Sequence, residues 1–295
     1  MQFARKLYYT LKSVGDHPLH RHAPVRSAFN FCLAQVAVRL VPGDILIPFP
    51  NGTRLVISPH MKGAAHFISP GLCEFEEMCF VTHFLRPDEL FADVGANVGA
   101  FTVLASGVAG ARTTAFEPSP TTFRYLEDNI RLNSLAGRSR ALNAAVGGKP
   151  GKLRLTQNLG TENYVCPGGQ DGVEVPVTTL DETFAAEWPA LMKVDVEGFE
   201  SEVFAGAERL LSQPSLAAII VERGGMGNRY GHDEAALHDR IRRHGFLPCA
   251  YSALTRVLDP IPPEAQGNII YVRDRGTVQK RLIEAVPFNF AGRRI

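Results

Sequence analysis

The chain has 295 residues, of which 45% are hydrophobic and 21% are charged. This composition is typical of one large globular domain with a sizeable core, and it excludes a wholly disordered chain. The 31 basic and 30 acidic residues give a formal net charge of +1, which argues against a nucleic acid partner bound through bulk charge.

No apolar run reaches the roughly 18 residues that a membrane-spanning helix needs. The segment 28–41 comes closest, but Asn30, Gln35 and Arg39 interrupt it. The five cysteines have neither zinc-site nor redox-motif spacing, so reduced thiols are expected. We therefore predict a cytoplasmic protein without an integral membrane segment, and no pattern indicates an oligomeric state.

The region before residue 86 differs from the rest because it is rich in histidine, proline and aromatic residues. Residues 45–49 and 53–57 flank Asn51-Gly52, a dipeptide that favours a two-residue hairpin turn. Residues 74–85 then have the pattern of a helix. We predict that residues 1–85 form an N-terminal extension of helices and a β-hairpin.

From about residue 89, short apolar runs alternate with helical patterns, which is typical of a doubly wound, mostly parallel sheet. The expected strands are 90–94, 113–116, 141–146, 191–196, 216–221, 247–251 and 269–272. The expected helices are 98–106, one opened by Ser119-Pro120, one within 199–211, and 232–244, and an inserted hairpin is expected from 152–156 and 173–178. We predict an α/β fold with a Rossmann-like, seven-stranded sheet over residues 86–275, followed by a C-terminal tail over residues 276–295.

Ligands of such sheets bind at the carboxyl ends of the strands, so polar residues there are site candidates. The first candidate is the segment Asp93-Val94-Gly95-Ala96-Asn97-Val98-Gly99, between a strand and a buried helix. Gly95 permits a tight turn and close approach by a ligand, and Gly99 permits close helix packing. Asp93 either accepts a hydrogen bond from a ligand ammonium group or organises the loop. The broken three-glycine pattern favours a carboxylate-bearing ligand over a pyrophosphate, and an ordinary strand–helix turn is the alternative.

Two further residues extend this candidate site across neighbouring strands. Glu117 ends the second strand, where an acidic residue about 20 positions beyond the glycine loop accepts from the two hydroxyls of a ribose. An exposed strand-end carboxylate is the alternative for Glu117. Asn143 lies in the terminal run of the third strand, either near the base of such a nucleoside or at a polar strand edge.

The segment Lys193-Val194-Asp195-Val196-Glu197-Gly198-Phe199-Glu200 ends the fourth strand and opens a helix. Asp195 and Glu197 alternate with valines, so their carboxylates project to one side. Repulsion between them can raise the proton affinity of one and produce a general base, or the pair can bind a divalent cation. The alternative is that these carboxylates only stabilise the N-terminus of the following helix by their negative charge. This alternative is strongest for Glu200. Glu222, at the end of the fifth strand, is a further candidate base.

These segments together resemble the motifs of the FkbM-type methyltransferase family. The resemblance is carried by residues 91–99, Ala115-Phe116-Glu117-Pro118, residues 143–147, Thr179-Leu180-Asp181, residues 193–200 and Phe204-Ala205-Gly206-Ala207. It spans about residues 71–222 in the family's order. The segment 193–200 is the most specific of these matches.

The resemblance implies the class I methyltransferase fold, S-adenosylmethionine as cofactor, and O-methylation of a hydroxyl on a sugar, glycan or small secondary metabolite. We predict Asp93, Gly95, Asn97, Gly99, Glu117 and Asn143 as cofactor-binding residues, and Asp195, Glu197 and Glu222 as catalytic candidates. The N-terminal extension is expected to cap the acceptor site. No metal site is assigned, although a divalent ion is left open. A nicotinamide-dependent oxidoreductase and a non-catalytic binding protein are the alternatives that the fold allows.

Overall fold

The computed structural model describes residues 12, 14–20, 23–61, 63–69, 71–156, 163–166, 172–224, 226–262 and 264–295. Its main sheet consists of β3 (Leu90–Val94), β4 (Arg112–Phe116), β5 (Ser139–Leu142), β9 (Leu191–Val194), β10 (Ala218–Arg223), β11 (Leu247–Ser252), β12 (Val257–Pro260) and β13 (Gly267–Val272). The strand order is β12-β11-β13-β10-β9-β3-β4-β5. β3, β4, β5, β9 and β10 run parallel, whereas β13 is antiparallel to β10 and β11. The predicted α/β fold with a mostly parallel sheet is confirmed.

The predicted number of seven strands is one too few, because β12 adds an edge strand to β11 in a sheet of eight. Leu258 is the one buried residue of β12, so its sequence shows neither an apolar run nor a clear alternation. Asp259 and Pro260 are residue types that are depleted in strands, and proline is confined largely to sheet edges. The pattern of β12 therefore does not indicate a strand.

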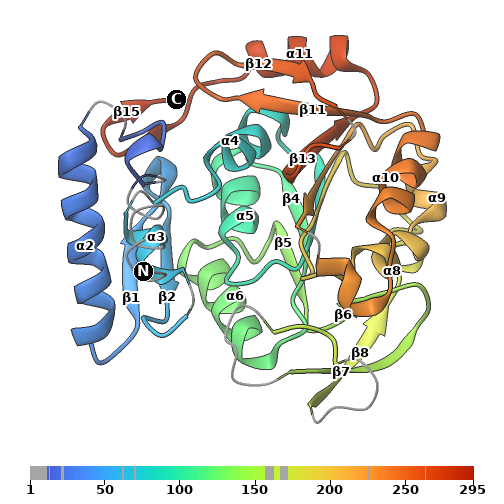
Figure 1. Cartoon of the computed structure of the whole chain (residues 1–295), viewed down its shortest axis with the longest axis horizontal. Coiled ribbons are helices and arrows are strands. Elements are labelled where there is room, and N and C mark those ends of the chain that lie inside the picture. The colour runs from blue at the N-terminus through green and yellow to red at the C-terminus, as the bar shows by residue number, and fades with distance from the viewer. Residues whose placement is uncertain are drawn as a thin grey trace.

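Side chains of the core strands alternate between the two faces of the main sheet. Phe91 packs in one hydrophobic core with Leu126 of α6 (Pro120–Leu132), whereas Ala92 packs in a second with Val203 of α8 (Glu200–Ala205). The first face also carries α4 (Phe75–Phe84) and α5 (Ala100–Val103), and the second carries α9 (Glu208–Leu211) and α10 (Glu234–Arg243). Helices thus cover both faces, and Figure 1 shows the resulting three layers.

The strand predicted over residues 141–146 is two strands in two different sheets. β5 ends at Leu142, whereas β6 (Ala145–Val146) pairs with β8 (Val173–Thr178), which pairs with β7 (Gly151–Leu155). The amide of Asn143 donates to the backbone carbonyls of Glu117 and Pro118 at 2.8 and 3.1 Å, which holds the chain where it leaves the main sheet. β7 and β8 form the predicted inserted hairpin.

The helix predicted within residues 199–211 is divided into α8 and α9 near Gly206. A Cβ atom at Gly206 would lie 2.2 Å from the backbone oxygen of Gly147, so the chain after β6 crosses too close for a side chain. The helix predicted over residues 98–106 begins as α5 at Ala100 and continues as a π-helical turn, η2 (Leu104–Val108). The break near Gly206 therefore arises from tertiary packing.

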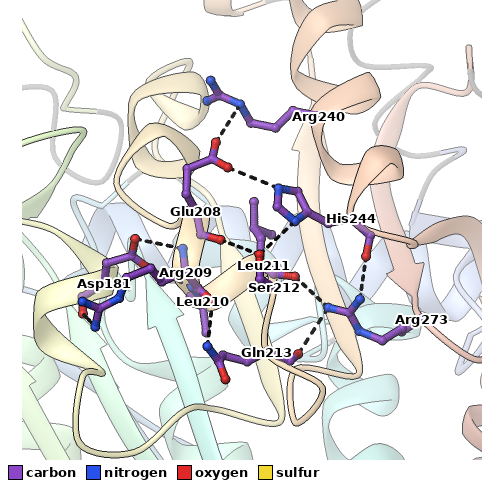
Figure 2. Close-up of polar contacts among 10 residues, drawn as sticks. All are labelled: Asp181, Glu208, Arg209, Leu210, Leu211, Ser212, Gln213, Arg240, His244 and Arg273. Carbon is purple, nitrogen blue, oxygen red and sulfur yellow. Dashed lines mark hydrogen bonds and ion pairs between the residues drawn. The ribbon is translucent and has the colours of Figure 1, made fainter.

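Side chains from elsewhere in the chain hold α9 at both of its ends (Figure 2). At its start, the N–H groups of Arg209 and Leu210 donate to the carboxylate of Asp181, in α7 (Leu180–Thr183), at 3.0 and 2.8 Å. At its end, the guanidinium of Arg273, just after β13, donates to the carbonyl of Leu211 at 2.7 Å. Hydrogen bonds to ionised groups are stronger than neutral ones, so these contacts fix the second helical layer.

The N-terminal hairpin consists of β1 (Ile45–Pro48) and β2 (Arg54–Ile57), paired antiparallel as predicted. Asn51 and Gly52 have φ angles of 52° and 80°, the positive values that the favoured two-residue turn requires. The helices α2 (Pro24–Leu40) and α3 (Ala64–Ile68) lie beside this hairpin, at one edge of the molecule in Figure 1.

Two asparagine side chains of α6 act as hydrogen-bonding partners for β2. Asn129 is fully buried, and its Oδ1 accepts from the N–H of Val56 at 2.6 Å. Its Nδ2 donates to the carbonyls of Val56 and Val98 at 3.0 and 2.8 Å. Asn133 makes the equivalent pair of bonds with the N–H and carbonyl of Arg54, closer to solvent. The hairpin is thereby fixed to the core.

The C-terminal residues return to the N-terminal hairpin. After α11 (Arg275–Ile283), β14 (Asn289–Phe290) and β15 (Arg293–Arg294) form a small hairpin. The N–H of Asn289 donates to Oδ1 of Asn51 at 2.7 Å. Residues before 86 and after 275 are therefore in contact, while the division of the chain at these two positions stays a prediction.

Within the part of the chain that the structure describes, no helix has the length and apolar content needed to cross a membrane. The five cysteines are free thiols: Cys79 and Cys249 are buried, and Cys32 is exposed on α2. The fold is therefore held together by noncovalent contacts.

We expect Asn129→Ala to lower the free energy of unfolding by about 3 kcal/mol, because three backbone groups near α6 lose a buried partner. Asn133→Ala removes a similar pair of bonds nearer to solvent, and should cost at most about 1 kcal/mol. Urea unfolding of both variants measures the difference. Equal losses of unfolding free energy in the two variants would show that burial does not strengthen the hydrogen bonds of Asn129.

Candidate functional site

A cavity of about 740 Å³ opens at the carboxyl ends of β3, β4 and β9. In the sheet, β3 lies between β9 and β4, the strand that follows it in the sequence. The strand order therefore reverses at β3, and the cavity lies at this point. Open α/β sheets bind ligands at such a position. Val94, Phe116 and Val146 contribute apolar wall.

The glycine loop after β3 is shaped by its contact with the end of β9. A Cβ atom at Gly95, whose φ is 79°, would lie 1.8 Å from the backbone oxygen of Asp195. The N–H of Asp195 in turn donates to the carbonyl of Val94 at 3.0 Å. Gly95 lines the cavity, but the close approach that it permits is made by the protein's own backbone. Gly99 lets α6 pack closely, because its Cβ would lie 2.7 Å from Cδ1 of Leu126.

Glu117 presents a fixed carboxylate on the cavity wall. Its Oε2 accepts from the N–H of Asn97 at 3.0 Å, and its Oε1 accepts from the N–H of Ser119 at 2.8 Å. Burial raises the pKa of Glu117 to about 7, and the two backbone hydrogen bonds oppose that rise. Each carboxylate oxygen has a further lone pair, so Glu117 can accept from two hydroxyl donors of a ligand.

Asp93 and Asn143 are outside the lining of this cavity. Asp93 is buried, accepts from the hydroxyl of Thr102 at 2.6 Å, and lies in register with Lys193 of β9. This environment favours the loop-organising alternative for Asp93. The amide of Asn143 is occupied by the carbonyls at the end of β4, which favours the strand-edge alternative.

Lys193 is a buried partner of Asp195 to which the sequence analysis assigned no role. Its Nζ donates to Oδ2 of Asp195 at 2.7 Å. Burial lowers the pKa of Lys193, but the carboxylates of Asp195, Glu74 and Asp93 raise it, and the net direction is upward. A lysine between two buried residues of a core strand is costly unless it is paired, and this was the signal available in the sequence.

The ends of β9 and β10 bring the three catalytic candidates together. Asp195 and Glu197 line the cavity, whereas Glu222, the second-last residue of β10 beside β9, lies outside its lining. Burial and, to a smaller extent, the charges of Asp195 and Glu197 together raise the pKa of Glu222 to about 7. Glu200 instead stabilises the turn, because its Oε1 accepts from the N–H groups of Val196 and Gly198 at 3.3 and 3.1 Å.

The inserted hairpin supplies a wall of the cavity that the sequence analysis missed. Asn163, Tyr164 and Val165 line it, opposite the strand ends. The guanidinium of Arg229 lies 3.6 Å from the ring centre of Tyr164, and the hydroxyl of Tyr230 donates to the carbonyl of Val165 at 2.9 Å. A single tyrosine in a long connection has no periodicity or motif, so no sequence signal marked it.

The lining of the cavity is negatively charged. Among its described residues are the carboxylates of Glu117, Asp195 and Glu197, and none is a lysine, an arginine or a histidine. Such a lining favours a cationic ligand such as a sulfonium and disfavours a pyrophosphate. Across the described ranges, no three His, Cys, Asp or Glu side chains are grouped so that they could hold a metal ion.

Comparison with known proteins identifies one domain family. The model of the Methyltransferase FkbM domain matches residues 93–248, more than half of the chain. The 31-O-demethyl-FK506 methyltransferase FkbM of Streptomyces tacrolimicus is 28% identical over 241 residues, 68% of this chain and 88% of that protein. The hexuronic acid methyltransferase AglP of Haloferax volcanii is 27% identical over 141 residues, 46% of this chain and 57% of that protein. A crystal structure of the C-terminal domain of precorrin-6Y C5,15-methyltransferase from Rhodobacter capsulatus aligns with a TM-score of 0.39 and 14% identity, over 68% of this chain and 87% of that one.

We expect the purified protein to bind S-adenosylmethionine and S-adenosylhomocysteine but not NAD, measured by calorimetry. Glu117→Gln should weaken both nucleosides by about tenfold, because both carry the ribose whose hydroxyls a carboxylate accepts best. Glu197→Gln should weaken the cationic S-adenosylmethionine more than the uncharged thioether. Binding of NAD, or full affinity in Glu117→Gln, would contradict this assignment of the cavity.

Proposed function

The chain belongs to the FkbM methyltransferase family, and we propose that it methylates a hydroxyl group of a sugar or another small molecule. It is an S-adenosylmethionine-dependent methyltransferase, as its family and its similarity to FkbM of Streptomyces tacrolimicus show. The oxidoreductase and the non-catalytic binding protein are thereby set aside. The observation that carries the proposal is the carboxylate-rich lining of the cavity at the strand ends, with no basic side chain among its described residues.

The residues of the cavity fit the cofactor that the family implies. When bound, S-adenosylmethionine supplies a methyl group on a positively charged sulfur. We assign Glu117 to the ribose hydroxyls, and the side of the cavity with Asp195 and Glu197 to the cationic part. Phe116 and Val146 provide apolar surface for the flat base. The wall formed by Tyr164 then helps to exclude water from the reacting atoms.

Two similar proteins support oxygen as the methyl-accepting atom. One is named for a 31-O-demethyl substrate and the other for a hexuronic acid, and both compounds carry hydroxyl groups. A hydroxyl is a weak nucleophile until its proton is removed, so the enzyme needs a base close to the acceptor. The three carboxylates at the ends of β9 and β10 are the groups available for this role.

Glu222 is the residue that we assign as this base. The carboxylate of Asp195 is committed to the buried ammonium of Lys193 at 2.7 Å, and Glu197 faces the proposed cofactor site. The raised pKa of Glu222, about 7, is close to the value at which a general base is most effective near neutral pH. Glu222 would accept the hydroxyl proton of the acceptor, while S-adenosylmethionine would supply the methyl group and leave as an uncharged thioether.

The proposed function is tested with S-adenosylmethionine labelled in its methyl group. We expect label to be transferred to a glycan or small-molecule fraction of a cell extract, and to stay bound after mild alkali. A methyl ether survives that treatment, whereas the methyl ester of a carboxyl acceptor is hydrolysed. Label that alkali releases as methanol would overturn the hydroxyl acceptor while leaving the enzyme a methyltransferase.

We expect Glu222→Gln to lower kcat by a factor of about 10² to 10⁴ without changing the Kd for S-adenosylmethionine. A base works when it is deprotonated, so kcat of the unmodified enzyme should rise with pH through about 7 and then level off. The variant should lose this dependence. Glu202→Gln, on α8, is the matched control and should keep it, because the carboxylates that raise the pKa of Glu222 are those of Asp195, Glu197 and Glu200. An unchanged pH profile in Glu222→Gln would move the base to Glu197.

A further inference from the structure

The helix α2 has two apolar faces. Ser27, Phe31, Ala34 and Val38 are buried against the rest of the molecule. On the opposite side lies the outer stripe, formed by Val25, Phe29, Leu33, Val36 and Leu40, which are 83, 63, 52, 52 and 75% exposed. With 3.6 residues per turn these five positions fall on one continuous face. α2 forms the left edge of the molecule in Figure 1.

The outer stripe is bordered by positive charge. At 100° per residue, Arg26 lies along one border of the stripe and Arg39 along the other, and both are exposed. The sequence of α2 contains no aspartate or glutamate. The next acidic residue along the chain, Asp44, accepts a hydrogen bond from the hydroxyl of Tyr125 at 2.7 Å. The exposed side of α2 is therefore apolar in the middle and cationic at both borders.

We propose that α2 docks this protein on an anionic lipid surface, with the outer stripe inserted among the headgroups and acyl chain ends. A helix with an apolar face and basic residues at its borders lies in the plane of such an interface. Each arginine close to an anionic surface contributes about 1 kcal/mol, which is about a fivefold increase in binding. The pattern fits adsorption on one leaflet, because no described helix is suited to cross the membrane.

The charge pattern also argues against a second copy of the chain as the partner of the outer stripe. In a symmetric dimer the same patch meets itself, so groups on α2 of one copy must be satisfied by α2 of the other. Because α2 has no acidic residue, Arg26 and Arg39 would find no carboxylate partner on the facing helix. Lipid phosphates supply the missing negative charge.

Co-sedimentation of the full chain with vesicles tests the proposal. The protein should bind vesicles of phosphatidylcholine that contain phosphatidylglycerol, and bind pure phosphatidylcholine much less. Phe29→Ser combined with Val36→Ser should weaken binding at least about tenfold, because two apolar side chains no longer enter the interface. Arg26→Gln combined with Arg39→Gln should weaken binding to the anionic vesicles by about 25-fold, from about fivefold for each arginine.

The matched control is Ile283→Ser, which removes a 61% exposed apolar side chain from α11 and should leave vesicle binding unchanged. All substituted positions are exposed, so thermal unfolding should be the same for every variant. Failure of the unmodified protein to bind anionic vesicles would overturn the proposal. So would a concentration-dependent dimer that Phe29→Ser and Val36→Ser dissociate, since the outer stripe would then be a self-interface.

Discussion

The buried ammonium of Lys193 is the charge around which the centre of the molecule is organised. It lies on β9 in the middle of the main sheet, bonded to Asp195 and in register with Asp93 of β3. Glu74, just before α4, adds a third nearby carboxylate and accepts a hydrogen bond from Asn268 of β13 at 3.1 Å. A buried cation without such compensation would cost several kcal/mol. The position of the N-terminal part of the chain, the packing of the two central strands and the orientation of Asp195 are therefore coupled through one electrostatic group.

This coupling divides the carboxylates of the site into two sets. Asp93, Glu74 and Asp195 balance Lys193, and Glu200 is engaged by the backbone of the turn after β9. Glu117, Glu197 and Glu222 are not among the carboxylates that raise the pKa of Lys193, and Glu117 and Glu197 line the cavity. The raised pKa values of Glu117 and Glu222 show the effect of burial without a strong local cation. A sulfonium bound in the cavity would place its positive charge in a region where the protein has an excess of negative charge.

The sequence predicts the parts of this fold that are encoded over short distances. β3, β9 and β10 are buried on both faces, so each appears as an apolar run, and Asn51-Gly52 marks its turn by backbone conformation alone. The site residues could be placed on strand ends because parallel strands bring their carboxyl ends to one edge. β12, the break at Gly206 and the wall formed by Tyr164 depend on which distant segment passes nearby. No local periodicity contains that information, and for the same reason the sequence left both alternatives open for Asn143, a site near the base or a polar strand edge.

The two motifs that mark the family form a single packing unit. Gly95 is required because the carbonyl of Asp195 occupies the place of a side chain, and Asp195 is aligned because its N–H bonds to Val94. The contact between the two motifs thus explains part of the sequence of each one, and this explanation needs no ligand. If the glycine loop were selected only for a cofactor, a Cβ atom at Gly95 would have space while no ligand is bound, but the backbone oxygen of Asp195 occupies that space. The carboxylate of Glu117, to which we assigned the ribose hydroxyls in our proposal, is held beside this unit, because the N–H groups of Asn97 and Ser119 fix it at the end of the neighbouring strand β4.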